Sequence, residues 1–286
     1  MFSGSMVALV TPFSNNLVDF CAMRKLIERQ IDAGSDGILI CGSTGEGLLL
    51  SNNEREQIIA TAIEITKKKT KIIVGCSACG TDNAISFVKQ AEKLKADGVL
   101  VVAPYYIKPT QQGIIEHFSR IHNDSDIPII MYNNPGRCGV NISIDTIVAL
   151  SKFARIVALK DSDTNLSRIQ LIKAQAPTLK LLSGDDASLL GYLAHGGDGC
   201  ISVTANIEPG LVKQLTSSVI AGDIKIAQEV NKKLTPLSET LFVESNPIPV
   251  KYALHRIGLI KNELRLPLVP ATQSTTVKID KILLST

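Results

Sequence analysis

The feature that most constrains this chain is an alternation of short apolar runs with longer stretches of helical periodicity, repeated about eight times. Residues 5–10 form the first apolar run, which ends at Thr11-Pro12. Residues 19–33 follow with apolar side chains at helical spacing, and Gly34 closes that stretch. Short runs rich in Val, Ile and Leu are typical of strands buried on both faces of a parallel sheet. The pattern therefore predicts repeated strand-then-helix units.

The number of these units favours a closed α/β barrel of the (β/α)₈ TIM type. An open doubly wound sheet is the alternative, but no G-x-G-x-x-G follows the first run. The predicted strands are residues 5–10, 36–41, 71–75, 98–103, 128–132, the run ending at Lys160, 179–183 and 199–203. The predicted helices are residues 19–33, one opening at the capping-box pair Ser51 and Glu54, 82–95, 111–122, 143–151, 164–175, a short one capped by Asp185 or Asp186, and one capped by Asn206.

The pattern becomes purely helical after residue 222. We expect a catalytic barrel over residues 1–222 and a C-terminal helical region over residues 223–286. Helices are predicted at 223–243 and 249–257, and a polar tail near 272–276.

Composition excludes several classes of protein. A net charge of +3 and 4% aromatic residues give no sign of a nucleic-acid partner. The basic run at residues 67–69 is interpreted as a solvated helix end. No stretch is long and apolar enough to span a membrane, and residues 1–13 lack the pattern of a signal peptide. We therefore expect a cytoplasmic protein.

Cysteine and histidine give no indication of a metal site. The six cysteines are too sparse for a disulfide scaffold, and the four histidines show no ligand-like spacing. Cys76 and Cys79 match C-x-x-C after a predicted strand, which is a weak redox signal, and we interpret them as incidental thiols in a loop.

Lys160 ends a β-branched run and is followed directly by Asp161. In a barrel, chemistry lies at the carboxyl ends of the strands, so this amine would meet a cleft there. Partial desolvation favours the neutral amine, which can attack a ketone to form a Schiff base. The ordinary alternative is a lysine that merely reaches solvent at the end of a strand.

Other strand ends carry polar residues that fit the same chemistry. The loop 42–47 offers hydroxyls and glycine-freed N–H groups that suit a small carboxylate, although an ordinary turn would look similar. Tyr132 can exchange a proton with an adduct on Lys160, and Arg137 can bind a carboxylate bidentately. A core tyrosine and a surface arginine are the ordinary alternatives. Together these residues predict a site for a small keto acid. The remaining polar strand-end residues are Thr11, Tyr105, Tyr106, Asp185 and Ser202.

The motifs at these positions resemble the dihydrodipicolinate synthase family, within the pyruvate-dependent class I aldolases that include N-acetylneuraminate lyase. The likeness runs through the whole chain in order. It rests on Gly42-Ser-Thr-Gly-Glu46, Pro104-Tyr-Tyr106, Tyr132-Asn-x-Pro-x-Arg137, Leu159-Lys160-Asp161, Ser183-Gly-Asp-Asp186, Gly199-x-Ile-Ser-Val-Thr204 and Asn246-Pro-Ile-Pro-Val-Lys251.

The resemblance implies condensation of pyruvate with aspartate 4-semialdehyde to 4-hydroxy-tetrahydrodipicolinate, in lysine and diaminopimelate biosynthesis, without a metal or organic cofactor. It also implies a homotetramer built as a dimer of dimers. Lys160 would form the Schiff base, with Tyr132, Ser43 and Tyr106 as the proton relay and Tyr106 contributed across the dimer interface. The implied substrate-binding residues are Thr44 for the carboxylate of pyruvate, Arg137 for that of the semialdehyde, and Gly184 and Ile201 through backbone groups.

Two positions can be compared between the synthase branch and the lyase branch of the superfamily. Ser43 stands where the synthases more often have threonine, and its loop also fits the lyases, whereas Arg137 favours a synthase. Cys138 stands where the synthases often have threonine. A lyase, another pyruvate-dependent aldolase and a non-catalytic keto-acid-binding barrel remain the alternatives.

The resemblance also bears on feedback by lysine. The loops that bind lysine in inhibited members correspond here to Asn52, Arg55, Cys79 and Asn83, and only Tyr105 clearly matches. We therefore expect weak or absent inhibition by lysine.

Overall fold

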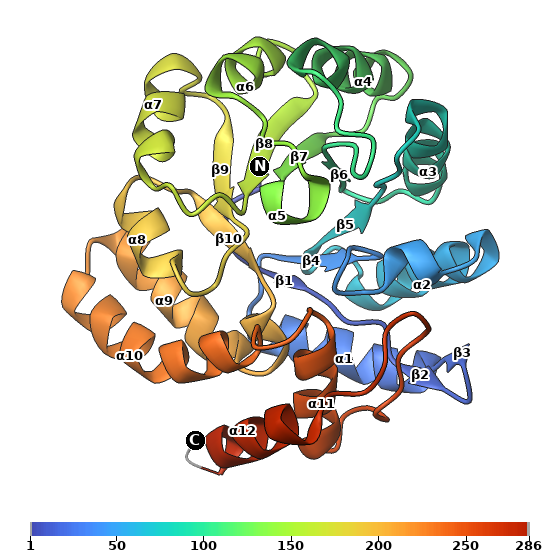
Figure 1. Cartoon of the computed structure of the whole chain (residues 1–286), viewed down its shortest axis with the longest axis vertical. Coiled ribbons are helices and arrows are strands. Elements are labelled where there is room, and N and C mark those ends of the chain that lie inside the picture. The colour runs from blue at the N-terminus through green and yellow to red at the C-terminus, as the bar shows by residue number, and fades with distance from the viewer. Residues whose placement is uncertain (1, 285–286) are drawn as a thin grey trace.

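The computed structural model describes residues 2–284, and eight parallel strands in this part of the chain close into a barrel (Figure 1). Neighbouring strands follow the order β1-β10-β9-β8-β7-β6-β5-β4, and β4 pairs back with β1. This confirms the predicted (β/α)₈ barrel. The barrel strands are β1 Gly4–Ala8, β4 Gly37–Ile40, β5 Lys71–Gly75, β6 Gly98–Val102, β7 Ile129–Asn133, β8 Ile156–Asp161, β9 Lys180–Ser183 and β10 Gly199–Ser202.

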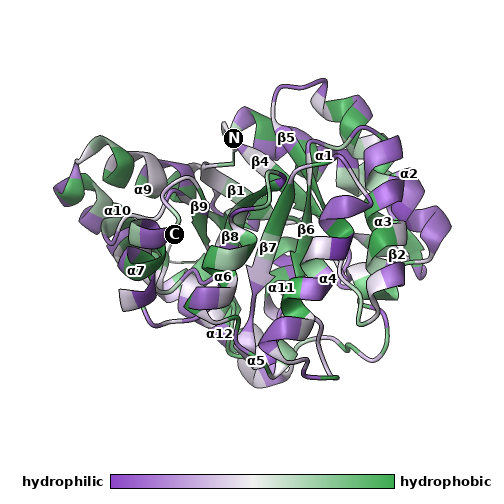
Figure 2. Ribbon diagram, turned by 90° about the horizontal axis from the view of Figure 1, so that it is seen from above, coloured by the Kyte–Doolittle hydropathy of each residue, from purple (hydrophilic) through white to green (hydrophobic). Residues whose placement is uncertain are grey.

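Helices surround the barrel, and the last three helices of the described chain pack mainly on other helices (Figures 1 and 2). Within the described residues the helices are α1 Phe20–Asp32, α2 Asn52–Thr66, α3 Thr81–Lys93, α4 Gln111–Asn123, α5 Pro135–Cys138, α6 Ile144–Leu150, α7 Ser167–Gln175, α8 Leu189–Ala194, α9 Pro209–Ala221, α10 Ile224–Thr240, α11 Ile248–Arg256 and α12 Gln273–Leu283. Two short 3₁₀ helices, η1 Gly47–Leu49 and η2 Thr204–Asn206, complete the set.

Burial on both faces explains why the strands read as continuous apolar runs. Ile72, Ile73 and Val74 are each fully buried, although alternate side chains point into the barrel and towards the helices. The strands therefore contribute apolar surface to two packing layers. Removal of that surface from water is the main favourable contribution to folding.

The predicted element boundaries hold to within a few residues. The β5 strand has the predicted bounds, and α2 begins with the predicted capping box between Ser51 and Glu54. The β8 strand extends one residue past Lys160, because Asp161 continues the pairing with β7 and β9.

Two predicted helix caps are wrong. Ser188, rather than Asp185 or Asp186, is the N-cap of α8, and the Asp186 carboxylate instead accepts hydrogen bonds from the N–H groups of Val203 and Thr204. Asn206 precedes α9 by three positions but does not cap it, since Glu208 is the N-cap.

The Asn206 amide binds main chain at the end of β1 instead. Its Nδ2 donates to the Ala8 carbonyl at 2.7 Å, and its Oδ1 accepts from the Val10 N–H at 3.2 Å. These bonds satisfy main-chain groups that leave the barrel pairing, which a pattern search for local caps cannot detect.

The end of the chain also differs from the prediction. The residues near 272–276 are not only a polar tail, because Thr272 precedes α12, whose Ile279 is fully buried. A small antiparallel pair, β2 Phe13–Ser14 with β3 Leu17–Val18, lies between β1 and α1 and was not predicted.

Within residues 2–284 no helix combines the length and apolarity needed to cross a membrane.

The buried imidazole of His117 predicts a loss of stability in acid. Burial lowers its pKa from 6.5 to about 4, and Nδ1 lies 2.9 Å from Thr81 Oγ1 while Nε2 has no partner. The unfolded chain therefore takes up this proton first as the pH falls. The neutral imidazole of His117 therefore makes its full contribution to the free energy of unfolding above pH 6.5. As the pH falls towards 4, about 3 kcal/mol of that free energy is lost.

The free energy of unfolding should fall in the parent when the pH is lowered from 7 to 4. In His117→Gln this fall should be about 3 kcal/mol smaller, because glutamine does not titrate. Denaturant unfolding at both pH values measures this. The exposed His195→Gln is the matched control. Equal losses in the parent and His117→Gln would contradict the prediction.

Candidate active site

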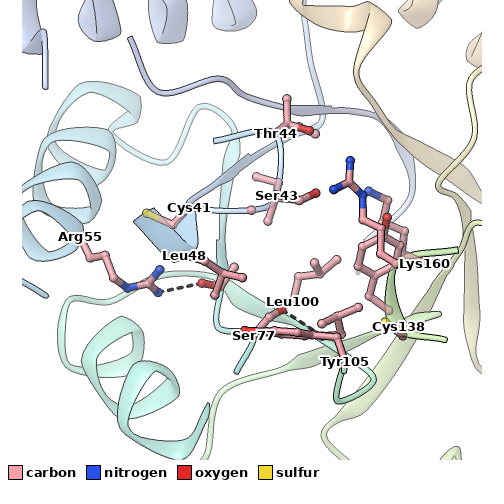
Figure 3. A pocket seen from close by; sticks show the side chains of 17 residues that line it. Cys41, Ser43, Thr44, Leu48, Arg55, Ser77, Leu100, Tyr105, Cys138 and Lys160 are labelled. Atoms are coloured by element: carbon pink, nitrogen blue, oxygen red, sulfur yellow. Dashed lines mark hydrogen bonds between the residues drawn. The ribbon is translucent and has the colours of Figure 1, made fainter. Parts of the chain in front are cut away.

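A cavity of about 220 Å³ opens at the carboxyl ends of the barrel strands. Lys160 lines one side, and Arg55 reaches the opposite side from α2 (Figure 3). A second hollow of about 210 Å³ adjoins it and shares Ser43, Thr44, Tyr132, Arg137 and Lys160 with the first. Six of the eight predicted site residues, these five and Gly184, therefore line the two adjoining hollows.

Lys160 and Tyr132 lie beside each other because they are partners in the register of β8 and β7. The Lys160 Nζ lies 4.4 Å from the centroid of the Tyr132 ring. Only 5% of Lys160 and 7% of Tyr132 is exposed, so water has little access to either group. An amine held in this way is available to a ligand in the cavity and shielded from bulk solvent.

The Tyr132 hydroxyl is held by two polar neighbours. Asn134 Nδ2 donates to it at 2.7 Å, and Ser162 Oγ lies 3.3 Å away. Burial raises the pKa of the Tyr132 hydroxyl, but the charge of Lys160, these two hydrogen bonds and the charge of Arg137 outweigh that effect, so its pKa is lowered from 10.0. A phenol with a lowered pKa exchanges protons more readily near neutral pH.

The next residues of the same two strands point away from the cavity and are bonded to each other. Asn133 Nδ2 donates to Asp161 Oδ1 at 2.8 Å, and Asn133 Oδ1 accepts from the Ile142 N–H at 3.0 Å. Arg168 Nε lies 3.4 Å from Asp161 Oδ2. This buried network ties β7 to β8 directly behind Tyr132 and Lys160.

Gly184 leaves the space that Lys160 occupies. A Cβ at this position would lie 2.9 Å from Lys160 Cε and 2.3 Å from Ser162 Oγ. Its carbonyl oxygen accepts a hydrogen bond from Ser162 at 3.0 Å. Only glycine therefore fits beside the lysine.

The loop 42–47 follows β4 and bends sharply over the cavity. A Cβ at Gly47 would lie 1.9 Å from the Cys41 carbonyl oxygen, and Glu46 has a left-handed backbone with φ of 52°. Thr11 Oγ1 donates to the Gly45 carbonyl at 2.6 Å. The Thr44 hydroxyl, which is buried, accepts from Asn246 Nδ2 at 2.9 Å.

Arg137 lies at the mouth of the cavity on the short helix α5. Asn134 caps this helix by accepting from the Arg137 N–H at 3.1 Å, and Gly139 ends it with a φ of 69°. The guanidinium donates to the Asn246 carbonyl at 2.9 Å and the residue is otherwise exposed. Its remaining donors can bind a carboxylate.

Two predicted site residues lie outside this arrangement. Tyr106 is 89% exposed and does not line either hollow. Ile201 is buried in β10, where it pairs with Met6 of β1, and it does not line them either. Within this chain, the structure therefore does not bring these two side chains to Lys160.

The cysteines show no sign of redox chemistry. All six thiols are free, and burial raises the pKa of Cys76 to about 12. A reactive cysteine needs the opposite change. Among residues 2–284, no cluster of His, Cys, Asp or Glu has the arrangement of a metal site.

Asn246 and Ser162 are two site residues that were given no role from the sequence. Asn246 contacts both Thr44 and Arg137 although it follows α10, far from either in sequence. Its position ahead of Pro247 at the start of α11 was the available signal. Ser162 lies two positions after Lys160, and its polar side chain at the end of the strand could have indicated it.

Known proteins match this chain along almost its whole length. The sequence model described as the Dihydrodipicolinate synthetase family matches residues 1–285. A relative from Parvibaculum lavamentivorans, named 4-hydroxy-tetrahydrodipicolinate synthase, is 44% identical, and the match covers 98% of this chain and 96% of the relative.

Two solved structures have the same fold. Dihydrodipicolinate synthase from Aquifex aeolicus superimposes with a TM-score of 0.97 at 42% identity, over 99% of this chain and 98% of that one. The chloride-inhibited dihydrodipicolinate synthase from Acinetobacter baumannii, complexed with pyruvate, gives 0.97 at 40% identity, over 99% and 98%.

The network behind the two strands predicts a stability effect. We expect Asn133→Leu to lower the free energy of unfolding by about 2–4 kcal/mol, because it removes one buried donor to Asp161 and leaves the Ile142 N–H without a buried acceptor. Asn141→Ala, which removes an exposed neighbour of Asn133, should cost about 1 kcal/mol or less. Denaturant unfolding at pH 7 compares them, and equal losses would contradict the prediction.

Proposed function

The chain belongs to the dihydrodipicolinate synthetase family, and we propose that it condenses pyruvate with aspartate 4-semialdehyde to 4-hydroxy-tetrahydrodipicolinate. This reaction belongs to lysine and diaminopimelate biosynthesis. The observation that carries the proposal is the shielded amine of Lys160 beside the Tyr132 ring, in a cavity with Arg137 at its mouth. We also propose that the enzyme is cytoplasmic and that it needs no metal or organic cofactor, because a covalent adduct on Lys160 supplies the chemistry.

Pyruvate enters with its carboxylate on the loop 42–47. The Thr44 hydroxyl and main-chain N–H groups of the loop bind that carboxylate, and Gly184 shapes the pocket through its backbone. The Lys160 nitrogen then forms a bond to the ketone carbon. The ketone oxygen takes up protons and leaves as water, which gives the Schiff base.

Tyr132 passes these protons. Its hydroxyl donates to the departing oxygen and later takes a proton from the methyl carbon of the adduct, which becomes an enamine. Ser43 and Tyr106 complete the proposed relay. Tyr106 has an exposed side chain and a φ of 70°, which supports a role at the site of a second copy.

The enamine carbon attacks the aldehyde of the second substrate, whose carboxylate binds Arg137. The substrate amino group then attacks the imine carbon, and cyclisation releases Lys160 as a free amine. This sequence consumes no oxidant or reductant, so the two substrates and the chain supply every atom and proton.

The proposed assembly is a homotetramer, built as a dimer of dimers. Tyr106 and Ile107 are 89% and 59% exposed on the loop after β6, and Leu48 is 59% exposed at the cavity. Large exposed apolar side chains next to a site favour contact with another subunit.

We also propose the division into a barrel of residues 1–222 and a C-terminal region of 223–286.

The function is tested by turnover of pyruvate with aspartate 4-semialdehyde, coupled to the NADPH-dependent reductase that consumes the product. We expect rapid NADPH loss, and none with N-acetylmannosamine in place of the semialdehyde. Condensation with the sugar alone would assign the chain to the lyase branch. A pyruvate adduct without turnover of either aldehyde would also contradict the proposal.

Two variants separate the steps. Borohydride with pyruvate should add the mass of a reduced adduct to the parent and to Arg137→Ala, but not to Lys160→Ala, because only Lys160 supplies the amine. Arg137→Ala should lower kcat/KM for the semialdehyde by about a hundredfold or more, from the loss of a charge-assisted pair. Full activity of Arg137→Ala would contradict the substrate assignment.

Lysine is expected to inhibit weakly or not at all. Arg55, at one of the positions that correspond to the effector loops, is 2% exposed, and its Nη2 donates to the Gly75 carbonyl at 2.7 Å. Its guanidinium also lies 4.2 Å from the centroid of the Phe87 ring. A fixed cation disfavours binding of another cation beside it. Strong inhibition in a low-millimolar lysine titration would contradict this.

A further inference from the structure

The loop 42–47 is bonded to the C-terminal helical region by a buried ion pair. Lys251 of α11 donates to Glu46 Oε1 at 2.5 Å, and both side chains are 0% exposed. The Arg265 N–H donates to the other carboxylate oxygen at 2.9 Å. Removal of two charges from water is costly, so such a pair needs close geometry and further hydrogen bonds.

The surroundings hold Lys251 in one position. Its ammonium lies 4.2 Å from the centroid of the Phe13 ring. The Arg265 guanidinium lies over the same ring at 4.4 Å and donates to the Leu49 carbonyl at 3.0 Å. Both ends of the short 3₁₀ helix η1 are therefore fixed by residues of the C-terminal region.

The pair acts on a loop that is also held by its own main-chain hydrogen bonds and by Thr11, which donates to the Gly45 carbonyl. Glu46 lies two residues after Thr44 and has a left-handed backbone, a conformation that a residue with a Cβ adopts only when its surroundings fix it. Ser43 is exposed, and the Thr44 hydroxyl is bonded to Asn246, which precedes the same helix α11. The contacts of Thr44 and Glu46 with the α11 side thus set part of the path of this loop.

We propose that Glu46 and Lys251 are positioning residues for pyruvate, which hold the hydroxyls and N–H groups of loop 42–47 where the pyruvate carboxylate binds. This rests on the proposed function, since it assigns the loop to pyruvate. Within the described residues, the hydrogen bonds of the pair reach neither Lys160 nor Arg137, so we expect its main effect on the first substrate.

Glu46→Asp is the first test, because it keeps both charges and shortens one side chain by a methylene group. The loop must then shift to keep the bond. The pyruvate concentration that gives half-maximal borohydride trapping should rise about tenfold or more, since small displacements in a binding site have large effects. The KM for aspartate 4-semialdehyde should change less than about threefold.

The double variant Glu46→Gln with Lys251→Met is the second test. It removes the bond without leaving an unpaired buried charge, so the thermal unfolding midpoint should recover relative to Lys251→Met alone while pyruvate half-saturation stays raised. Lys213→Met is the matched control. It breaks an ion pair with Asp36, which precedes β4 at the other end of the barrel, and should leave pyruvate half-saturation unchanged.

Either folded variant with the pyruvate half-saturation of the parent would overturn the inference. Loss of folding in both variants would also overturn it, because the pair would then serve stability alone. A parent protein that traps no pyruvate would instead overturn the proposed function. Measurement of the parent first therefore distinguishes the two failures.

Discussion

The site depends on the register between β7 and β8. Parallel pairing places Tyr132 opposite Lys160 and Asn133 opposite Asp161, and alternate side chains of a strand point to opposite faces. One pair therefore faces the cavity while the other is buried behind it. A shift of one residue would exchange the two pairs, which would put a carboxylate where the amine is needed. The hydrogen bond from Asn133 to Asp161 is made only in the observed register.

Closure of the barrel extends this constraint to the other strands. Because β1 pairs with both β4 and β10, the ends of all eight strands converge on one rim within the described residues. Residues far apart in sequence, such as Ser43 and Gly184, then line the same hollow. The barrel does not by itself fix the loops on this rim. Asn246 and Lys251 of the C-terminal helical region hold the loop 42–47 in place by hydrogen bonds.

Much of the fold could be predicted from the sequence, because each strand is buried on both faces and each helix has a local pattern. The β5 bounds and the capping box of α2 depend only on nearby residues. The roles of Asn206 and Asp186 could not be predicted in this way, since their partners lie on other strands and loops. The same holds for Asn246, whose contacts with Thr44 and Arg137 span 202 and 109 positions of the sequence.

The charges of the site limit the ligands that it can accept. Lys160 and Arg137 both line the two adjoining hollows, and the Tyr132 hydroxyl between them has a lowered pKa. Cations in a partly apolar cavity attract anions more strongly than they would in water. A substrate with one carboxylate on the loop 42–47 leaves Arg137 free for the carboxylate of a second. The site is therefore suited to two small acids, and a neutral aldehyde would leave the guanidinium without its partner.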